Sequence, residues 1–141
     1  MMTEPIRVRK IVKQLQPRLN QIVRNLIKDA TLDAKTKSAL REVWVYPVDQ
    51  MKGCAYYEHS TITIPGWAFQ TRRRGFLRHY VAHELAHIAA QVKYQKGAGH
   101  GPEFYKCLKQ LTKDTLHYEL EYKPRNAAAA GIKKPKQNGK I

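Results

Sequence analysis

The sequence predicts an α+β fold in which short strands lie between helical segments. Three observations lead to this class: an amphipathic pattern in the first 29 residues, short β-branched and aromatic runs in the middle, and a long apolar helical stretch after them. The chain has 141 residues, of which 43% are hydrophobic, so we expect one domain with a modest core.

The first helical segment is expected over Pro5–Asp29, with Lys and Arg on the face opposite its apolar stripe. Pro17 removes one amide donor, so the helix should kink or split there. A second, shorter helix is expected within 31–42, with Thr31 or Asp33 as its N-cap. We therefore predict that residues 1–42 form an N-terminal helical segment that packs on the core. The stripe consists of Val8, Ile11, Val12, Leu15, Leu19, Ile22, Val23 and Leu26.

Short apolar runs predict the strands. Val43–Val48 is β-branched and aromatic, and Cys54–Glu58 and Thr61–Pro65 are separated by a short turn, so these last two are expected to form a hairpin. Proline is tolerated at strand ends, which agrees with Pro65 closing the second strand. The alternation in His117–Tyr122 predicts a last strand.

The long helix is expected within 70–95, with its regular part starting near Gly75. The glycine-rich stretch "KGAGHG", residues 96–101, should end it. Pro102 suits the first turn of a helix, so a further helix is expected to follow from that residue.

The long helix carries two histidines and a glutamate among Ala, Leu, Val and Ile. His83 and His87 are four residues apart, so on a helix they point the same way and can share one metal ion. Neutral imidazole is a good zinc ligand. Glu84 can act as general base on a water molecule activated by the metal. This H-E-x-x-H pattern predicts a zinc site; the alternative is a polar network in the core without a metal.

A catalytic zinc site needs three protein ligands and an open position, so the third ligand must come from beyond the helix. His100 is the best candidate, because its flanking glycines let the chain double back. His79 cannot join both His83 and His87. Eight residues of helix rise about 12 Å, whereas two ligands of one ion lie about 4 Å apart or less. We expect His79 to be structural or partly exposed.

Positive charge dominates the composition, with 26 Lys and Arg against 11 Asp and Glu and a formal net charge of +15. Such a balance suggests a polyanionic partner, most often nucleic acid. Residues 123–141 contain no acidic residue and are expected to form a flexible basic tail. The candidate phosphate contacts, which could equally be solvated charges, are Arg72, Arg73, Arg74, Lys133, Lys134 and Lys136.

The two cysteines, Cys54 and Cys107, form no C-x-x-C pair, which argues against a disulfide framework. We expect both to be buried and inert. No apolar run approaches the roughly 18 residues that a membrane span needs. The expected location is therefore intracellular: cytoplasmic, or nuclear or nucleoid-associated if the protein binds DNA.

Several of these features together resemble the SprT-like metallopeptidase domain of Spartan proteases. They are the "CAYYE" and "TITI" strands, the "HELAH" helix and "GHGPEF" opening the next helix, and the resemblance covers residues 43–122. It implies a zincin-like domain with a small antiparallel sheet beside the active-site helix. It implies one Zn²⁺ held by His83, His87 and His100, with Glu84 as catalytic base. Many members continue into a Cys-rich zinc ribbon, which this sequence lacks.

The expected function is that of a zinc-dependent metallopeptidase, a monomer that cleaves DNA-associated or DNA-crosslinked proteins. DNA is then an expected partner beside the protein substrates. Tyr118 or Tyr122 could stabilise the oxyanion if the last strand lines the cleft. The main alternative is a basic nucleic-acid-binding module whose zinc is structural and non-catalytic. A third possibility is an interaction protein whose basic tail folds onto a partner.

Overall fold

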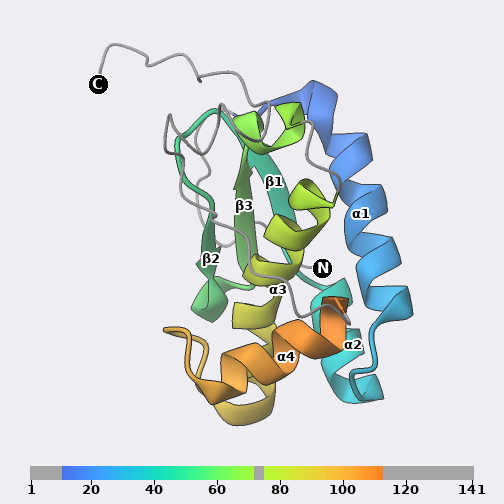
Figure 1. The fold of residues 1–141 in the computed structure, drawn as a ribbon, viewed down its shortest axis with the longest axis vertical. Helices are drawn as coiled ribbons and strands as arrows, with labels where there is room; N and C mark the ends of the chain where they lie inside the picture. Colours follow the sequence, from blue (N-terminus) through green and yellow to red (C-terminus); the bar gives the residue numbers. More distant parts are fainter. Residues whose placement is uncertain (1–10, 72–74, 113–141) are drawn as a thin grey trace.

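Four α-helices and one three-stranded sheet make up the part of the chain that the computed structural model describes, residues 11–71 and 75–112 (Figure 1). This confirms the α+β class. The elements, in chain order, are a 3₁₀ turn Lys13–Leu15, α1 Gln16–Asp29, α2 Ala34–Arg41, β1 Trp44–Val48, β2 Cys54–Tyr56, a 3₁₀ turn Tyr57–His59, β3 Thr61–Pro65, a 3₁₀ turn Gly66–Gln70, α3 Phe76–Tyr94 and α4 Pro102–Thr112.

Helix α1 begins at Gln16, so Pro17 lies in its first turn. The expected helix that runs through Pro17 with a kink or split is wrong, because the described residues before Gln16 form a bridge at Ile11 and a 3₁₀ turn at Lys13–Leu15. Pro17 is tolerated where it lies, since the first turn of a helix needs no amide donor. Ile11 pairs with Val48 in an isolated antiparallel bridge, so the chain before α1 runs along β1. The part of the apolar stripe that lies on α1 faces the core as expected, with Leu19 and Leu26 buried. Ile27, which is not in the stripe, is buried as well.

Helix α2 is capped by Asp33, one of the two candidates for this position. The Asp33 carboxylate accepts from the Thr36 amide at 3.1 Å and from the Thr36 hydroxyl at 2.7 Å. These bonds lower the pKa of Asp33, because they favour its ionised form. The cap satisfies an amide that the first helical turn leaves without a partner.

The sheet is mixed, which corrects the antiparallel sheet that we expected. Its strand order is β1-β3-β2, with β2 and β3 antiparallel and β1 and β3 parallel. The expected β2–β3 hairpin is present. The chain reverses once between β1 and β2 and again between β2 and β3, so β1 and β3 run the same way. Among the described strands, β2 lies at an edge of the sheet.

Helix α3 is the centre of the core and packs against α1, α2, α4, β2 and β3. It is apolar on most of its circumference, as expected of a helix covered on several sides. It starts after Gly75, close to the expected position, and α4 starts at Pro102. Among residues 11–71 and 75–112, no helix is long and apolar enough to cross a membrane.

Some expectations fall outside the described residues. They are the last strand at 117–122, the roles of Tyr118 and Tyr122, the basic tail 123–141 with Lys133, Lys134 and Lys136, and the cluster Arg72, Arg73 and Arg74.

Candidate metal centre

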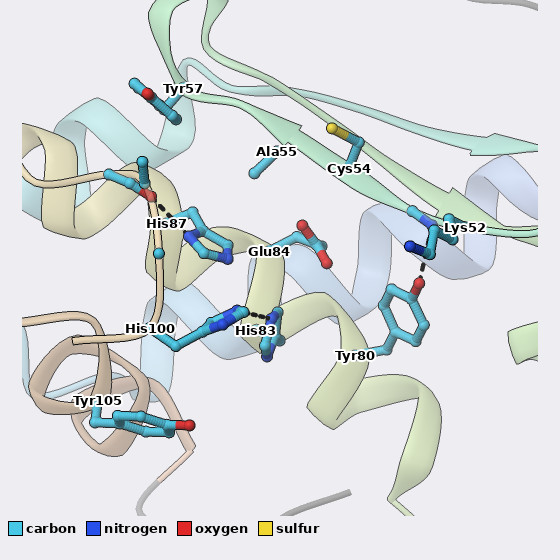
Figure 2. A pocket seen from close by; sticks show the side chains of 14 residues that line it. Lys52, Cys54, Ala55, Tyr57, Tyr80, His83, Glu84, His87, His100 and Tyr105 are labelled. Atoms are coloured by element: carbon cyan, nitrogen blue, oxygen red, sulfur yellow. Dashed lines mark hydrogen bonds between the residues drawn. The ribbon is translucent and has the colours of Figure 1, made fainter. Parts of the chain in front are cut away.

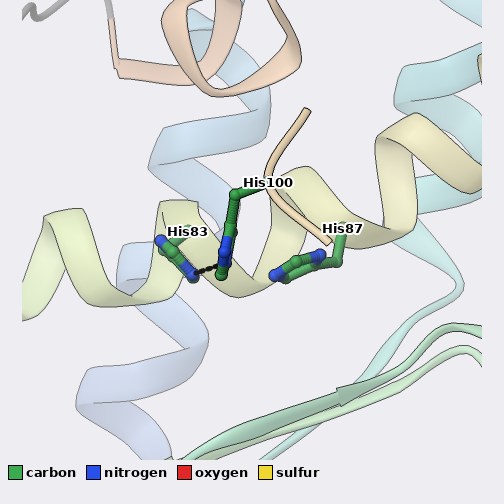
Figure 3. Close-up of side chains that lie close together, drawn as sticks. All are labelled: His83, His87 and His100. Atoms are coloured by element: carbon green, nitrogen blue, oxygen red, sulfur yellow. Dashed lines mark hydrogen bonds between the residues drawn. The ribbon is translucent and has the colours of Figure 1, made fainter. Parts of the chain in front are cut away.

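Three histidines meet at one point between α3 and the loop that leads to α4 (Figure 3). His83 and His87 project from α3 one turn apart, and His100 reaches them from the loop. The Nε2 atoms of His83 and His100 are 3.1 Å apart, and one nitrogen from each ring lies within 4.8 Å of the others. The structure thus brings together the three side chains that the H-E-x-x-H pattern and the glycine-flanked loop singled out.

The loop turns back on α3 immediately after the helix ends. Gln95 terminates α3 in the left-handed conformation, with a φ of 56°, and Gly99 also has a positive φ of 79°. A glycine carries no Cβ penalty there, so the chain can reverse just before His100. The sequence signal for this reversal was the group of three glycines in residues 96–101.

Phe104, in the first turns of α4, contacts all three imidazoles. Its ring centroid is 4.8 Å from that of His83, 4.6 Å from that of His87 and 4.8 Å from that of His100. The phenyl ring is 1% exposed, so it belongs to the core and gives the histidines a fixed apolar support. Aromatic contacts at these distances restrict how far each imidazole can rotate.

The protonation states favour metal binding. Burial, with the neighbouring histidines, lowers the pKa of His83 to about 3, and burial also lowers the pKa of His87. Both rings are therefore neutral near pH 7, as a metal ligand requires. The Nδ1 of His87 lies 2.7 Å from the Gly97 carbonyl oxygen. A carbonyl only accepts, so Nδ1 carries the proton and Nε2 keeps its lone pair. This set of nitrogen donors could bind a metal ion, and it fits zinc.

Glu84 points into the same pocket from the next position of α3 (Figure 2). It is only 7% exposed, and burial raises its pKa to about 8. A cation held by the three histidines would act in the opposite direction and favour the carboxylate. The protonation state of Glu84 therefore depends on whether the three histidines hold a cation.

The pocket is about 500 Å³ in volume and lies between α3, the 97–100 loop and the edge strand β2. Cys54 lines it and is exposed, so the expectation that this cysteine is buried is wrong, whereas Cys107 is buried as expected. Three tyrosines that the sequence patterns did not point to, Tyr57, Tyr80 and Tyr105, also line the pocket. Nothing in their local sequence marks them, because they come from three separate elements.

His79 lies on α3 but outside the cluster of three. It is 5% exposed, in agreement with a structural role for this histidine.

A second pocket, of about 590 Å³, lies between α1 and α2. Apolar side chains contribute to it, and each ionisable residue among the described residues that line it is a cation. Lys37 donates from Nζ to the Lys28 carbonyl oxygen at 3.1 Å. The cations are Arg24, Lys28, Lys37 and Arg41, and we call this feature the basic pocket.

Comparison with known proteins gives one match. The model of the SprT-like family matches residues 13–127. That range starts before α1, so it includes both N-terminal helices as well as the residues on which the resemblance was based. No curated protein and no solved structure matches the chain.

Proposed function

The chain belongs to the SprT-like family, and from this premise we propose that it is a zinc-dependent metallopeptidase that hydrolyses peptide bonds. One observation carries the proposal: three imidazole nitrogens converge within 4.8 Å of one another, beside a buried glutamate in an open pocket. A hydrolytic zinc site needs three protein ligands and an open position, and this arrangement provides for both.

In this proposal His83, His87 and His100 hold the ion through ring nitrogens. Bound zinc would supply Lewis acidity, which polarises a peptide carbonyl and makes water easier to deprotonate. The Glu84 carboxylate takes a proton from the attacking water and then delivers it to the nitrogen of the leaving amine. The low dielectric around Glu84 strengthens its electrostatic response to a neighbouring cation.

We further propose that the substrates are proteins associated with DNA. Two features support this: the formal net charge of +15, and the basic pocket, whose four cations could contact phosphates.

The competing function, a nucleic-acid-binding module with a structural zinc, shares these features. A structural zinc site usually closes its fourth position with a further protein ligand. Of the described residues, three are close enough to form the cluster.

The test is cleavage of a basic DNA-binding protein by the wild type and by Glu84→Gln, each with and without single-stranded DNA. Removing the general base should reduce the cleavage rate by about 10²–10⁴-fold while zinc remains bound. Glu42→Gln, at an exposed position that follows α2, is the matched control and should cleave as the wild type does.

Turnover by Glu84→Gln at the wild-type rate would contradict the role given to this glutamate. Cleavage that does not depend on DNA would support the peptidase activity and contradict the proposal that the substrates are proteins associated with DNA. If zinc is bound and no sample cleaves, the binding module with a structural zinc becomes the better description.

A further inference from the structure

We propose that Gln91 is a positioning residue of the metal centre, which acts through the peptide groups of Gly97 on both His87 and His100. The inference rests on the proposed metal centre, but it does not require peptidase activity.

Gly97 is held to α3 through both of its polar backbone groups. Its carbonyl oxygen lies 2.7 Å from His87 Nδ1, and its amide donates to Gln91 Oε1 at 3.0 Å. His87 and Gln91 are four residues apart, so they lie on the same face of the helix, one turn from each other. Gly97 therefore bridges a metal ligand and a neutral amide side chain.

The close approach of this segment to α3 requires glycine. A Cβ at position 97 would lie 2.8 Å from Tyr57 Cγ, 2.9 Å from Gln91 Cβ and 3.0 Å from the His87 carbonyl oxygen. The backbone of Gly97 thus lies directly on the helix. The hydrogen bond from the Gly97 amide to Gln91 stabilises this contact, because the amide would otherwise have no acceptor among its apolar neighbours.

Two ligands depend on this arrangement. The Gly97 carbonyl sets the tautomer of His87 and the orientation of its ring, as the outer partner of a ligating histidine usually does. Gly97 also precedes His100 by only three residues, so it anchors the loop that brings His100 to the site. Gln91 is not among the residues that line the metal pocket, so its effect passes through Gly97.

Loss of the Gln91 oxygen would free the Gly97 amide and allow its peptide groups to rotate. The His87 ring would then lose its fixed acceptor, and the His100 loop would be held less firmly. Changes to such outer partners typically weaken metal affinity by about 10–100-fold. Because Gln91 acts one bond further out, we expect the lower end of that range.

The experiment compares zinc dissociation constants, measured by competition with a chromogenic chelator, for the wild type, Gln91→Met, Gln91→Glu and Gln21→Met. Methionine keeps the length of the side chain but has no acceptor oxygen, so affinity should fall about tenfold, whereas glutamate keeps an acceptor and should stay within about threefold of the wild type. Gln21 is exposed on α1, and its replacement controls for the substitution itself.

Visible absorption of the Co²⁺-loaded proteins reports on ligand geometry without any turnover. The bands should change in Gln91→Met and be kept in Gln91→Glu. Wild-type zinc affinity together with wild-type cobalt bands in Gln91→Met would overturn the inference. Equal weakening by Met and Glu would also overturn it, because the acceptor oxygen would then not matter.

The failure of this inference can be told apart from that of the proposed function. If the wild type and Gln91→Met bind zinc equally well, only the role proposed for Gln91 is contradicted. A second outcome is that the wild type binds zinc tightly but cleaves no substrate, while Gln91→Met binds zinc more weakly. That outcome supports the role of Gln91 and contradicts the peptidase activity. A wild type that does not bind zinc overturns both.

Discussion

His83 and Glu84 are neighbours in the sequence, and burial shifts their pKa values in opposite directions. The pKa of His83 falls to about 3, and that of Glu84 rises to about 8. In both cases the low dielectric disfavours the charged form. Without a metal, these two side chains are therefore both neutral near pH 7, and both shifts affect stability.

The effect of Glu84 on stability can be isolated above pH 7 in the metal-free protein. In the unfolded chain this carboxyl loses its proton near its ordinary value of 4.5, whereas in the folded chain it does so only near 8. Between those values the folded state binds more protons, so the free energy of unfolding falls as pH rises and levels off above the folded pKa. The opposite contribution of His83 is complete above its ordinary value of 6.5.

We therefore expect the wild type to lose about 1 kcal/mol of stability between pH 7 and pH 8 through Glu84 alone. Glu84→Gln has no such group and should lack this loss. Urea unfolding of both metal-free proteins at the two pH values measures the difference. The same pH slope in both proteins would show that burial does not raise the pKa of Glu84 in this way.

At the scale of the elements, α3 and the 3₁₀ turn Gly66–Gln70 hold the segment that leads into the edge strand β2. The Gly53 amide donates to the Tyr80 hydroxyl at 2.9 Å, and Trp67 Nε1 donates to the Met51 carbonyl oxygen at 2.7 Å. A Cβ on Gly53 would lie 2.5 Å from the Thr63 carbonyl oxygen, so this segment also packs closely on β3. These contacts fix the start of β2, which forms one wall of the metal pocket.

Tyr80→Phe should remove the acceptor for the Gly53 amide and keep the ring in place. Loss of one such bond, with a partly buried donor left behind, costs about 1 kcal/mol of stability. Tyr94→Phe is the control on the same helix and should change stability by less than about 0.5 kcal/mol. Denaturant unfolding provides the comparison, and equal effects of the two substitutions would mean that the Gly53 bond does not stabilise the fold.

At the scale of the whole molecule, the charge is strongly positive, and some of it is gathered in the basic pocket between α1 and α2. Both helices contribute cations to this pocket, so it exists only when they pack together. Nucleic acid binding through phosphates releases counterions and therefore weakens with salt. The salt dependence can thus separate a localised contact from the general effect of net charge.

If the basic pocket binds single-stranded DNA, the double variant Arg24→Ala with Arg41→Ala should reduce the salt slope of binding by about 0.7 for each phosphate that the variant no longer neutralises. Lys106→Ala with Lys109→Ala removes the same number of charges from exposed positions on α4 and is the control. Fluorescence anisotropy with a labelled oligonucleotide at several salt concentrations measures both slopes. Equal slopes for the two double variants would place the DNA-binding surface elsewhere.

The features that could be predicted from the sequence depend on residues close together in the chain. Apolar periodicity predicted α1, the long apolar helical stretch predicted α3, and Pro102 predicted the start of α4. The β-branched and aromatic runs predicted all three described strands. A spacing of four residues places His83 and His87 on one helix face whatever surrounds them, because helix geometry is local. The glycine-flanked position of His100 was likewise a local signal for a chain reversal.

Other features arose only when distant segments packed together. The insertion of β3 between β1 and β2, the exposure of Cys54 and the bridge from Gln91 through Gly97 to His87 all depend on which surfaces meet. The raised pKa of Glu84 also depends on packing, because it results from burial of the side chain by several elements. The sequence by itself determined the helices, the strands and the candidate ligands, because backbone propensity and side-chain spacing act over a few residues. Only the tertiary structure decided strand order, burial and the outer support of the ligands, because these depend on contacts between residues far apart in the chain.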